Sequence, residues 1–198
     1  MRATDWDAKY TGEPHRWGRS ANELLEELLT EQRAGRAVDL ACGAGRHAHW
    51  MAARGWQVRA VDFSSTALEV ARSEAPDSAS GIDWVQADVR SWDCPDRVGV
   101  VLIAYLHLPE AELRTVLRRA AGWLVPGGRL IYLGHAWENL RHGVGGPTHA
   151  EVLPTASSLA TAAQPLRIEQ LRHVARRTDE GTAIDLLLVA TGWQAASR

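Results

Sequence analysis

Short apolar segments alternate with helical segments along the first two thirds of this 198-residue chain. Residues 98–104, VGVVLIA, are apolar on both faces, which is typical of a strand that is covered on both sides. Alternation of this kind predicts a parallel sheet with right-handed crossover helices on its two faces. The chain is also long enough to bury a core of its own.

Seven strands are predicted, at residues 37–42, 57–62, 83–87, 98–104, 129–133, 166–176 and 183–191. The predicted helices are residues 20–33, 46–54, 64–74, 109–119 and 155–163. Ser20 is expected to cap the first helix, because Glu23 follows at the spacing of a capping box. The turn Asp179-Glu180-Gly181 predicts a hairpin between the last two strands. We therefore expect an α/β fold, a doubly wound, mostly parallel seven-stranded sheet with an antiparallel C-terminal hairpin strand.

Ligands bind beyond the carboxyl ends of the strands in such sheets. Five segments are expected at this edge, residues 42–46, 62–64, 88–89, 104–107 and 134–137. Gly43 and Gly45 would let a ligand approach the backbone closely, and free amides would open the helix that follows them. Two glycines alone are weak evidence for a ligand, since a tight turn also needs them.

Three carboxylates and no lysine belong to this predicted site. Asp62 could accept both hydroxyls of a ribose, and Asp88 could meet an exocyclic amine or a ring edge. Asp39 could orient the turn amides or attract a cationic ligand. A pyrophosphate would be repelled here, so the carboxylates favour a phosphate-free nucleoside with a positive centre, such as S-adenosylmethionine.

Residues 36–135 resemble the cofactor-binding half of class I S-adenosylmethionine-dependent methyltransferases. The resemblance rests on VDLACGAGRHAHWMAARGWQVRAVDFSSTALEVARSEA, and then on WVQADV, VVLIAYLHLP and WLVPGGRLIYLGH, in this order and spacing. The opening WDAKYTGEPHRWG is similar to the lead-in of small bacterial methyltransferases of the tellurite-resistance and thiopurine types. The resemblance implies a Rossmann-like fold and a single domain over 1–198. Within it, 1–19 would be a lid over the cleft, 36–135 the cofactor-binding core and 166–191 the closing hairpin.

The resemblance also implies which residues contact the cofactor. They are Asp39, Cys42, Gly43, Gly45, Asp62, Phe63, Ser64, Asp88, Val89 and Ala104. The first four would surround the methionine part, the next three the ribose and one side of the adenine, and Asp88 and Val89 the adenine amine and ring. Ala104 would lie near the methionine amino group or the sulfonium. Ala41 departs from the family, which often has its first glycine there; its methyl group is expected to be tolerated if the backbone angles are ordinary.

Catalytic candidates are Tyr105, His107 and His135, because each follows a strand at the expected ligand edge. A histidine here could act as a general base or contact the substrate, or could be a surface or capping residue. Trp6, Tyr10 and Trp17 precede the first core helix and could cover the cleft or simply pack on the domain; we expect a cover. No metal site is expected, because the two rings of His47-Ala48-His49 would point apart on a helix.

These residues predict methyl transfer to a small molecule by in-line displacement. The acceptor could be a thiol or chalcogen, a phenol or an amine, and a phenol or alcohol would need a base. The formal net charge of −2 disfavours nucleic acid, and no apolar run reaches the ~20 residues of a membrane span. Two cysteines and an opening without an apolar core favour a cytoplasmic location. Two alternatives stay open, an NAD(P)-dependent Rossmann oxidoreductase, against which the missing third glycine argues, and a non-catalytic module that binds S-adenosylmethionine.

Overall fold

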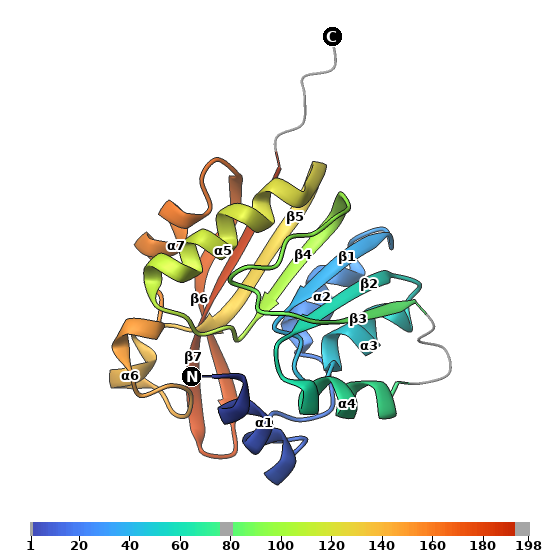
Figure 1. The fold of residues 1–198 in the computed structure, drawn as a ribbon. Coiled ribbons are helices and arrows are strands. Elements are labelled where there is room, and N and C mark those ends of the chain that lie inside the picture. Colours follow the sequence, from blue (N-terminus) through green and yellow to red (C-terminus); the bar gives the residue numbers. More distant parts are fainter. Residues whose placement is uncertain (1, 76–80, 193–198) are drawn as a thin grey trace. The chain divides into compact units, whose positions relative to one another are not determined.

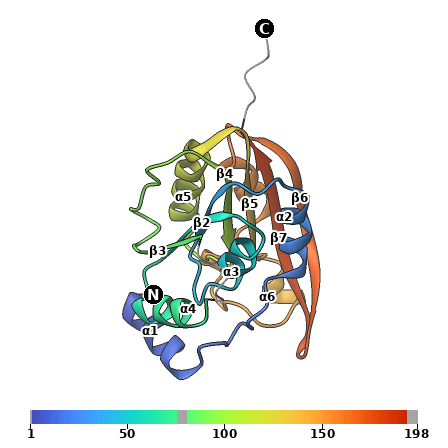
Figure 2. The ribbon, with the colours of Figure 1, turned by 90° about the vertical axis from the view of Figure 1, so that its right-hand side faces the viewer.

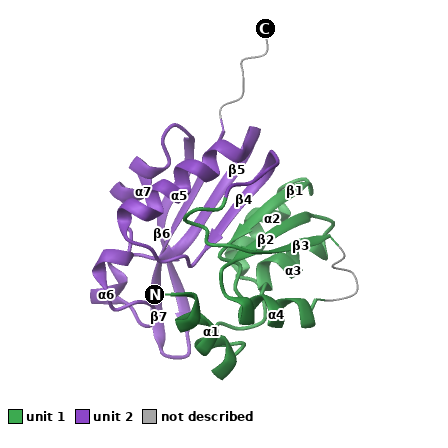
Figure 3. Ribbon diagram, viewed as in Figure 1, with its two compact units in different colours: residues 1–92 green, residues 93–198 purple. Residues whose placement is uncertain are grey.

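The computed structural model describes residues 2–75 and 81–192 (Figure 1). Backbone contacts divide the chain into two compact units, residues 1–92 and residues 93–198 (Figure 3). Residues 1, 76–80 and 193–198 of the predicted domain 1–198 lie outside the described ranges. None of the helices in the described ranges combines the length and the apolar character needed to cross a membrane.

The first unit is a parallel three-stranded sheet with its helices. Its elements are α1 (Ala3–Gly12), α2 (Glu23–Thr30), β1 (Arg36–Leu40), α3 (Arg46–Ala52), β2 (Gln57–Asp62), α4 (Ser65–Ser73) and β3 (Ile82–Gln86). The strands lie in the order β3-β2-β1, with Asp39 in register with Ala60. Buried apolar side chains of β1 and β2 form the core of this unit.

The first core helix begins later than predicted. Asn22, and not Ser20, is the N-cap of α2, and its side-chain oxygen accepts hydrogen bonds from the amides of Leu24 and Leu25. Asn is as good an N-cap as Ser, so the capping-box pattern alone did not decide between them. The helix also ends at Thr30, before the predicted limit at residue 33.

The turn after β1 contains an alanine in a left-handed conformation. Ala41 has φ of +59°, so the expectation of ordinary backbone angles at this position is wrong. A left-handed conformation costs a residue with a Cβ atom about 1–2 kcal/mol, which explains the family's preference for glycine here. The turn is held by other contacts, among them the hydrogen bond from the Gly43 amide to Asp62.

The opening segment contains a helix that the sequence patterns did not predict. Helix α1 lies beside α4 in both views (Figures 1 and 2). The Ser64 hydroxyl donates to Asp7 Oδ1 at 2.6 Å, and the Thr66 amide donates to the same oxygen at 3.3 Å. A carboxylate near the amino end of a helix is stabilised by the helix dipole, so Asp7 attaches α1 to the start of α4.

The second unit contains the remaining strands. Its elements are β4 (Val98–Ala104), α5 (Glu110–Trp123), β5 (Leu124–His135), α6 (Asn139–His142), a 3-10 helix (Ala150–Val152), α7 (Ala156–Ala162), β6 (Arg167–Thr178) and β7 (Gly181–Thr191). The strands lie in the order β4-β5-β7-β6, with β4 and β5 parallel and β7 antiparallel to both of its neighbours. Strand β5 is longer than predicted because the expected turn at 126–128 joins it, where Gly127 and Gly128 hydrogen-bond with Gly192.

The two units together contain the seven predicted strands within the described residues. Five are in parallel pairings, and the C-terminal pair forms the predicted antiparallel hairpin. The α/β fold class, a mostly parallel seven-stranded sheet, is confirmed.

Replacing Gly45 by Ala should destabilise the protein by about 1–3 kcal/mol, the usual cost of overpacking. Gly45 has φ of +79°, and an added Cβ would lie 2.5 Å from the Trp84 ring. Urea unfolding measures the change. Gly122→Ala is the control, because this helical glycine has nothing within 4 Å of an added Cβ and should gain ~0.5–1 kcal/mol. Equal stability of the two variants would contradict the packing role of Gly45.

Candidate functional site

Asp62 ties the end of β2 to the glycine turn. Its side chain is buried, and its two oxygens accept hydrogen bonds from the Gly43 amide and the Ser64 amide, each at 2.9 Å. Burial raises the pKa of Asp62, although these amides favour the charged form. A carboxylate has about four acceptor positions, so Asp62 retains capacity for a ligand's hydroxyl groups.

Asp39 is the second buried carboxyl group of this unit. Its side chain is only 1% exposed, and burial together with the nearby charge of Asp62 raises its pKa to about 7. Its Oδ2 atom has no hydrogen-bond partner. A buried carboxyl oxygen without a partner is costly, and a cationic ligand nearby would offset that cost.

The two glycines of the turn have different neighbours. A Cβ on Gly43 would lie 2.2 Å from the Tyr10 hydroxyl oxygen, whereas a Cβ on Gly45 would enter the Trp84 ring. The absence of a side chain at Gly45 therefore leaves space for the Trp84 ring of the same unit. At Gly43 the space is filled by α1, the segment predicted to act as a lid.

The predicted lid residues form one aromatic cluster. The ring centroids of Trp6 and Trp17, and those of Tyr10 and Trp17, are 5.5 Å apart. Tyr10 is buried, and burial raises its pKa, so its hydroxyl stays protonated. Trp17 is 43% exposed. The cluster lies against the Gly43 turn of the same unit through Tyr10.

The other predicted cofactor residues of this unit have partners of their own. Asp88 forms a bidentate ion pair with Arg90, with Oδ2 2.6 Å from Nη2, and these hydrogen bonds lower the pKa of Asp88. An adenine amine would thus compete with the Arg90 guanidinium for the carboxylate oxygens of Asp88. Ser64 caps α4, and Val89 and Cys42 are buried. Burial raises the pKa of the Cys42 thiol, which disfavours a nucleophilic role.

All three predicted catalytic residues come together in the second unit. Tyr105 follows Ala104 at the end of β4, and His135 ends β5, the parallel neighbour of β4. The His135 ring centroid lies 5.5 Å from that of Tyr105 and 5.6 Å from that of His107. The His107 and His135 rings are stacked, with 18° between their planes. Strand ends of this unit thus carry an aromatic and imidazole cluster.

The cluster surrounds a buried carboxylate that sequence reasoning missed. Asp185 on β7 is 1% exposed, and its Oδ2 accepts the Tyr105 hydroxyl at 2.9 Å and Arg176 Nε at 2.8 Å. Its Oδ1 lies 3.0 Å from His135 Nδ1, although the two are not aligned as a hydrogen bond. Burial would raise the pKa of Asp185, but His135 and Arg176 hold it below its usual range. The signal for Asp185 was available, since it is the one acid within the apolar run AIDLLLVA.

His107 and His135 differ in their surroundings. Burial, with a smaller contribution from His135, lowers the pKa of His107 to about 4. The Nε2 atom of His107 is buried without a partner. Its ring is therefore neutral near pH 7, and it is a weak base at that pH.

His47 and His49 do not face a common centre. His47 Nε2 accepts the Asn22 amide at 3.3 Å, and burial lowers the pKa of His47 to about 3. His49 Nε2 lies 2.9 Å from the Ala71 carbonyl oxygen. Among residues 2–75 and 81–192, no three histidine, cysteine or carboxylate side chains are grouped as a metal site would need.

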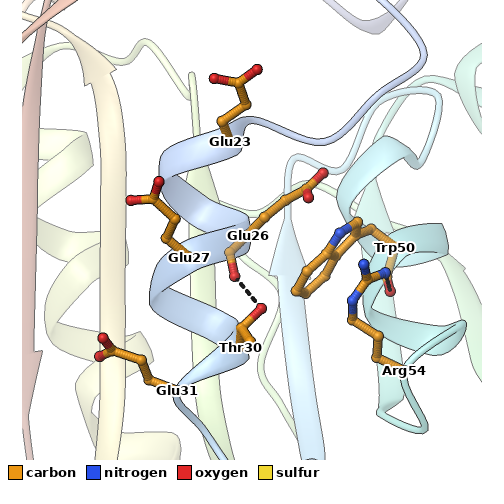
Figure 4. A pocket seen from close by; sticks show the side chains of 7 residues that line it. All are labelled: Glu23, Glu26, Glu27, Thr30, Glu31, Trp50 and Arg54. Carbon is orange, nitrogen blue, oxygen red and sulfur yellow. Dashed lines mark hydrogen bonds between the residues drawn. The ribbon is translucent and has the colours of Figure 1, made fainter.

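A surface cavity of about 520 Å³ lies between α2 and α3 of the first unit (Figure 4). It is lined by Glu23, Glu26, Glu27, Thr30, Glu31, Trp50 and Arg54. The Arg54 guanidinium already stacks on the Trp50 ring, 3.8 Å from its centroid. None of the predicted site residues lines this cavity, so it is distinct from the turn that Asp62 holds.

Comparison with known proteins identifies the fold. Residues 37–128 match a family model described as a methyltransferase domain. The ubiquinone biosynthesis O-methyltransferase of Serratia proteamaculans (strain 568) is 33% identical over 110 residues, which are 51% of this chain and 45% of that protein. The chain spans only 36% of another relative, the ribosomal RNA small subunit methyltransferase C of Chromohalobacter salexigens, which is 30% identical over 120 residues. The chain thus covers less than half the length of these curated relatives.

Solved structures are similar over nearly the whole chain. The N-methyltransferase NodS from Bradyrhizobium japonicum WM9, in complex with S-adenosyl-L-homocysteine, gives a TM-score of 0.75 at 15% identity and covers 97% of this chain and 99% of its own. A structure from work on the conversion of a disulfide bond into a thioacetal group during echinomycin biosynthesis gives a TM-score of 0.77 at 20% identity, covering 99% and 94%. Residues 37–128 thus match a methyltransferase-domain model, and the chain has the Rossmann-like fold that the sequence resemblance predicted and that these methyltransferase structures share.

Proposed function

We propose that this protein transfers a methyl group from S-adenosylmethionine to a small-molecule acceptor. The observation that carries the proposal is the pair of buried carboxyl groups, Asp39 and Asp62, around a glycine turn. When bound, the donor supplies a methyl group on a cationic sulfur. Asp39, with its unpartnered oxygen, suits a ligand that is cationic and carries no phosphate.

The residues of the first unit have distinct proposed roles. Asp62 binds the ribose hydroxyls while it holds the Gly43 amide in place. Phe63, Ser64, Asp88 and Val89 line the adenine, and Cys42 and Gly43 lie beside the methionine part. Gly45 acts through packing of the turn. Ala104, from the second unit, stays a predicted contact of the methionine amino group.

The comparisons support a small acceptor. The Serratia relative is named for ubiquinone biosynthesis, which is a small-molecule pathway, and the chain's net charge of −2 offers no general attraction to nucleic acid. Of the three candidate bases, His135 is favoured because a carboxylate supports it, whereas His107 is a weak base and Tyr105 already donates its proton. The tellurite-resistance or thiopurine subgroup and the cytoplasmic location stay predictions.

An NAD(P)-dependent oxidoreductase is disfavoured by charge. Its cofactor would bring a pyrophosphate to the turn beside the buried carboxyl groups of Asp39 and Asp62. In a module that only binds the donor, the buried charged cluster around Asp185 would serve the structure alone. Binding of S-adenosylhomocysteine without binding of NAD would exclude the oxidoreductase, and observed methyl transfer would exclude the non-catalytic module.

Asp62→Asn should weaken the binding of S-adenosylhomocysteine at least tenfold, or ~1.4 kcal/mol. An amide side chain has too few acceptor positions to accept hydrogen bonds from both ribose hydroxyls and from the amides of the turn. Isothermal titration calorimetry measures the dissociation constants, and the melting temperature verifies that the variant is folded. Asp83→Asn is the control, because Asp83 lies on the neighbouring strand β3, is exposed and pairs with Arg59. Affinity of the folded Asp62→Asn variant within twofold of wild type would contradict the ribose role, and binding of NAD alone would favour the oxidoreductase.

Asp39→Asn should raise the melting temperature of the unliganded protein more at pH 8 than at pH 4. The folded Asp39 holds its proton up to about pH 7, whereas an ordinary aspartate loses it near 3.8. Between pH 3.8 and about pH 7 the folded state therefore binds more protons than the unfolded state. The free energy of unfolding falls as the pH rises through this range to about 7. Asparagine is close in shape to the protonated acid and removes this loss. A melting-temperature difference that is constant from pH 4 to pH 8 would contradict the raised pKa.

A further inference from the structure

Asp185 is the most deeply buried charged group of the second unit. It lies in β7 among apolar residues, with Leu186, Leu187 and Leu188 following it, all fully buried. A carboxylate in such surroundings persists only if its oxygens are satisfied by donors or positive charges. Its neighbours come from other strands or strand ends, namely Tyr105, His135 and Arg176.

The two oxygens of Asp185 have separate partners. Oδ2 accepts from both the Tyr105 hydroxyl and Arg176 Nε. Oδ1 lies 3.0 Å from His135 Nδ1, which is within ion-pair distance although the two atoms are not aligned as a hydrogen bond. A buried carboxylate oxygen favours a proton on the nitrogen that faces it. A proton on Nδ1 of His135 would be stabilised at this position, and Nε2 would then keep its lone pair.

The His135 ring is held in this orientation from its other sides. His107 stacks on one face, and a Cβ on Gly146 would lie 2.6 Å from His135 Cδ2. The glycine loop is in turn fixed by Asn139, whose Nδ2 donates to the Gly145 carbonyl at 2.9 Å. Asn139 Oδ1 accepts the amide of Ile184, the residue before Asp185, at 2.7 Å. Asn139 therefore connects the loop that backs His135 to the strand that carries Asp185.

We propose that Asp185 is a positioning residue, which keeps His135 in the Nδ1–H form so that Nε2 takes the proton of the acceptor, and that the acceptor is a weakly acidic hydroxyl. This inference rests on the proposed function. An acidic thiol is largely ionised near neutral pH, and an aromatic amine is uncharged with a free lone pair, so neither needs a base held in this way. A phenol or enol does.

In the proposed step, methyl transfer is coupled to transfer of the acceptor's proton. The acceptor oxygen forms a bond to the methyl carbon while the carbon–sulfur bond breaks, and the electron pair of that bond stays on sulfur. The acceptor proton passes to His135 Nε2, which makes the ring cationic. Asp185 stays ionised and stabilises that cation, and Arg176 keeps Asp185 ionised throughout. Tyr105 fixes the second oxygen of Asp185 and transfers no proton.

The first test needs no acceptor. Nitrogen-15 NMR of the full chain with S-adenosylhomocysteine added should show the His135 ring as the Nδ1–H tautomer, assigned by loss of its signals in His135→Gln. In Asp185→Asn the ring should change to Nε2–H or to a mixture. Asp179→Asn, an exposed acid in the turn of the same hairpin, is the control and should leave the tautomer unchanged. Wild-type His135 as Nε2–H, or no change in a folded Asp185→Asn, overturns the positioning role.

The second test compares catechol, 4-nitrocatechol and thiophenol as acceptors. Catechol keeps its proton near neutral pH, whereas the other two are largely ionised. Asp185→Asn should lower kcat for catechol at least tenfold and lower it much less for 4-nitrocatechol, with the affinity for S-adenosylhomocysteine within twofold of wild type. An equal loss for both catechols indicates a merely structural role. Methylation of thiophenol alone, or of none of the three, overturns the hydroxyl assignment, while loss of donor binding in wild type overturns the proposed function itself.

Discussion

The first unit depends on the hydrogen bonds that Asp62 accepts from Gly43 and Ser64. One carboxylate thereby satisfies an amide of the turn after β1 and an amide at the start of α4. These bonds hold a turn that contains Ala41 in a left-handed conformation, which is unfavourable by itself. Burial raises the pKa of Asp62, and the burial of Asp39, together with the nearby charge of Asp62, raises the pKa of Asp39. The fold of the turn and the charge offered to a ligand are consequences of the same group.

In the second unit, too, a buried carboxylate connects separate segments of the chain. Asp185 joins the ends of β4 and β5 to the C-terminal hairpin through Tyr105, His135 and Arg176. The cost of burying the acid is offset by a guanidinium, a phenol and an imidazole. Such an arrangement restricts where each proton can reside, because each donor has one acceptor oxygen. Structural anchoring and control of proton position are thus combined in one strand residue.

The sequence predicted the strands well, because apolar runs such as 98–104 are bounded by clear turns, and both 57–62 and 98–104 match the observed strands. It predicted the start of α2 less well, since Ser20 and Asn22 are both good caps and only packing selects between them. It brought His107, His135 and Tyr105 together through topology. It did not single out Asp185, although this acid interrupts an apolar run. Its contact with Arg176 was hidden, because pairing between β6 and β7 decides which side chains meet, and that register is not readable from one strand alone. The sequence also did not predict that Gly45 packs against Trp84, a residue far from it along the chain.

The proposed function requires that the buried carboxyl groups of the first unit bind a phosphate-free adenosine. A crystal structure of the chain with S-adenosylhomocysteine measures this most directly. Both ribose hydroxyls are expected within hydrogen-bond distance of Asp62, with the methionine part beside the Gly43 turn. Density for the ligand elsewhere, or a ribose that contacts neither oxygen of Asp62 at saturating concentration, would contradict this mode of binding.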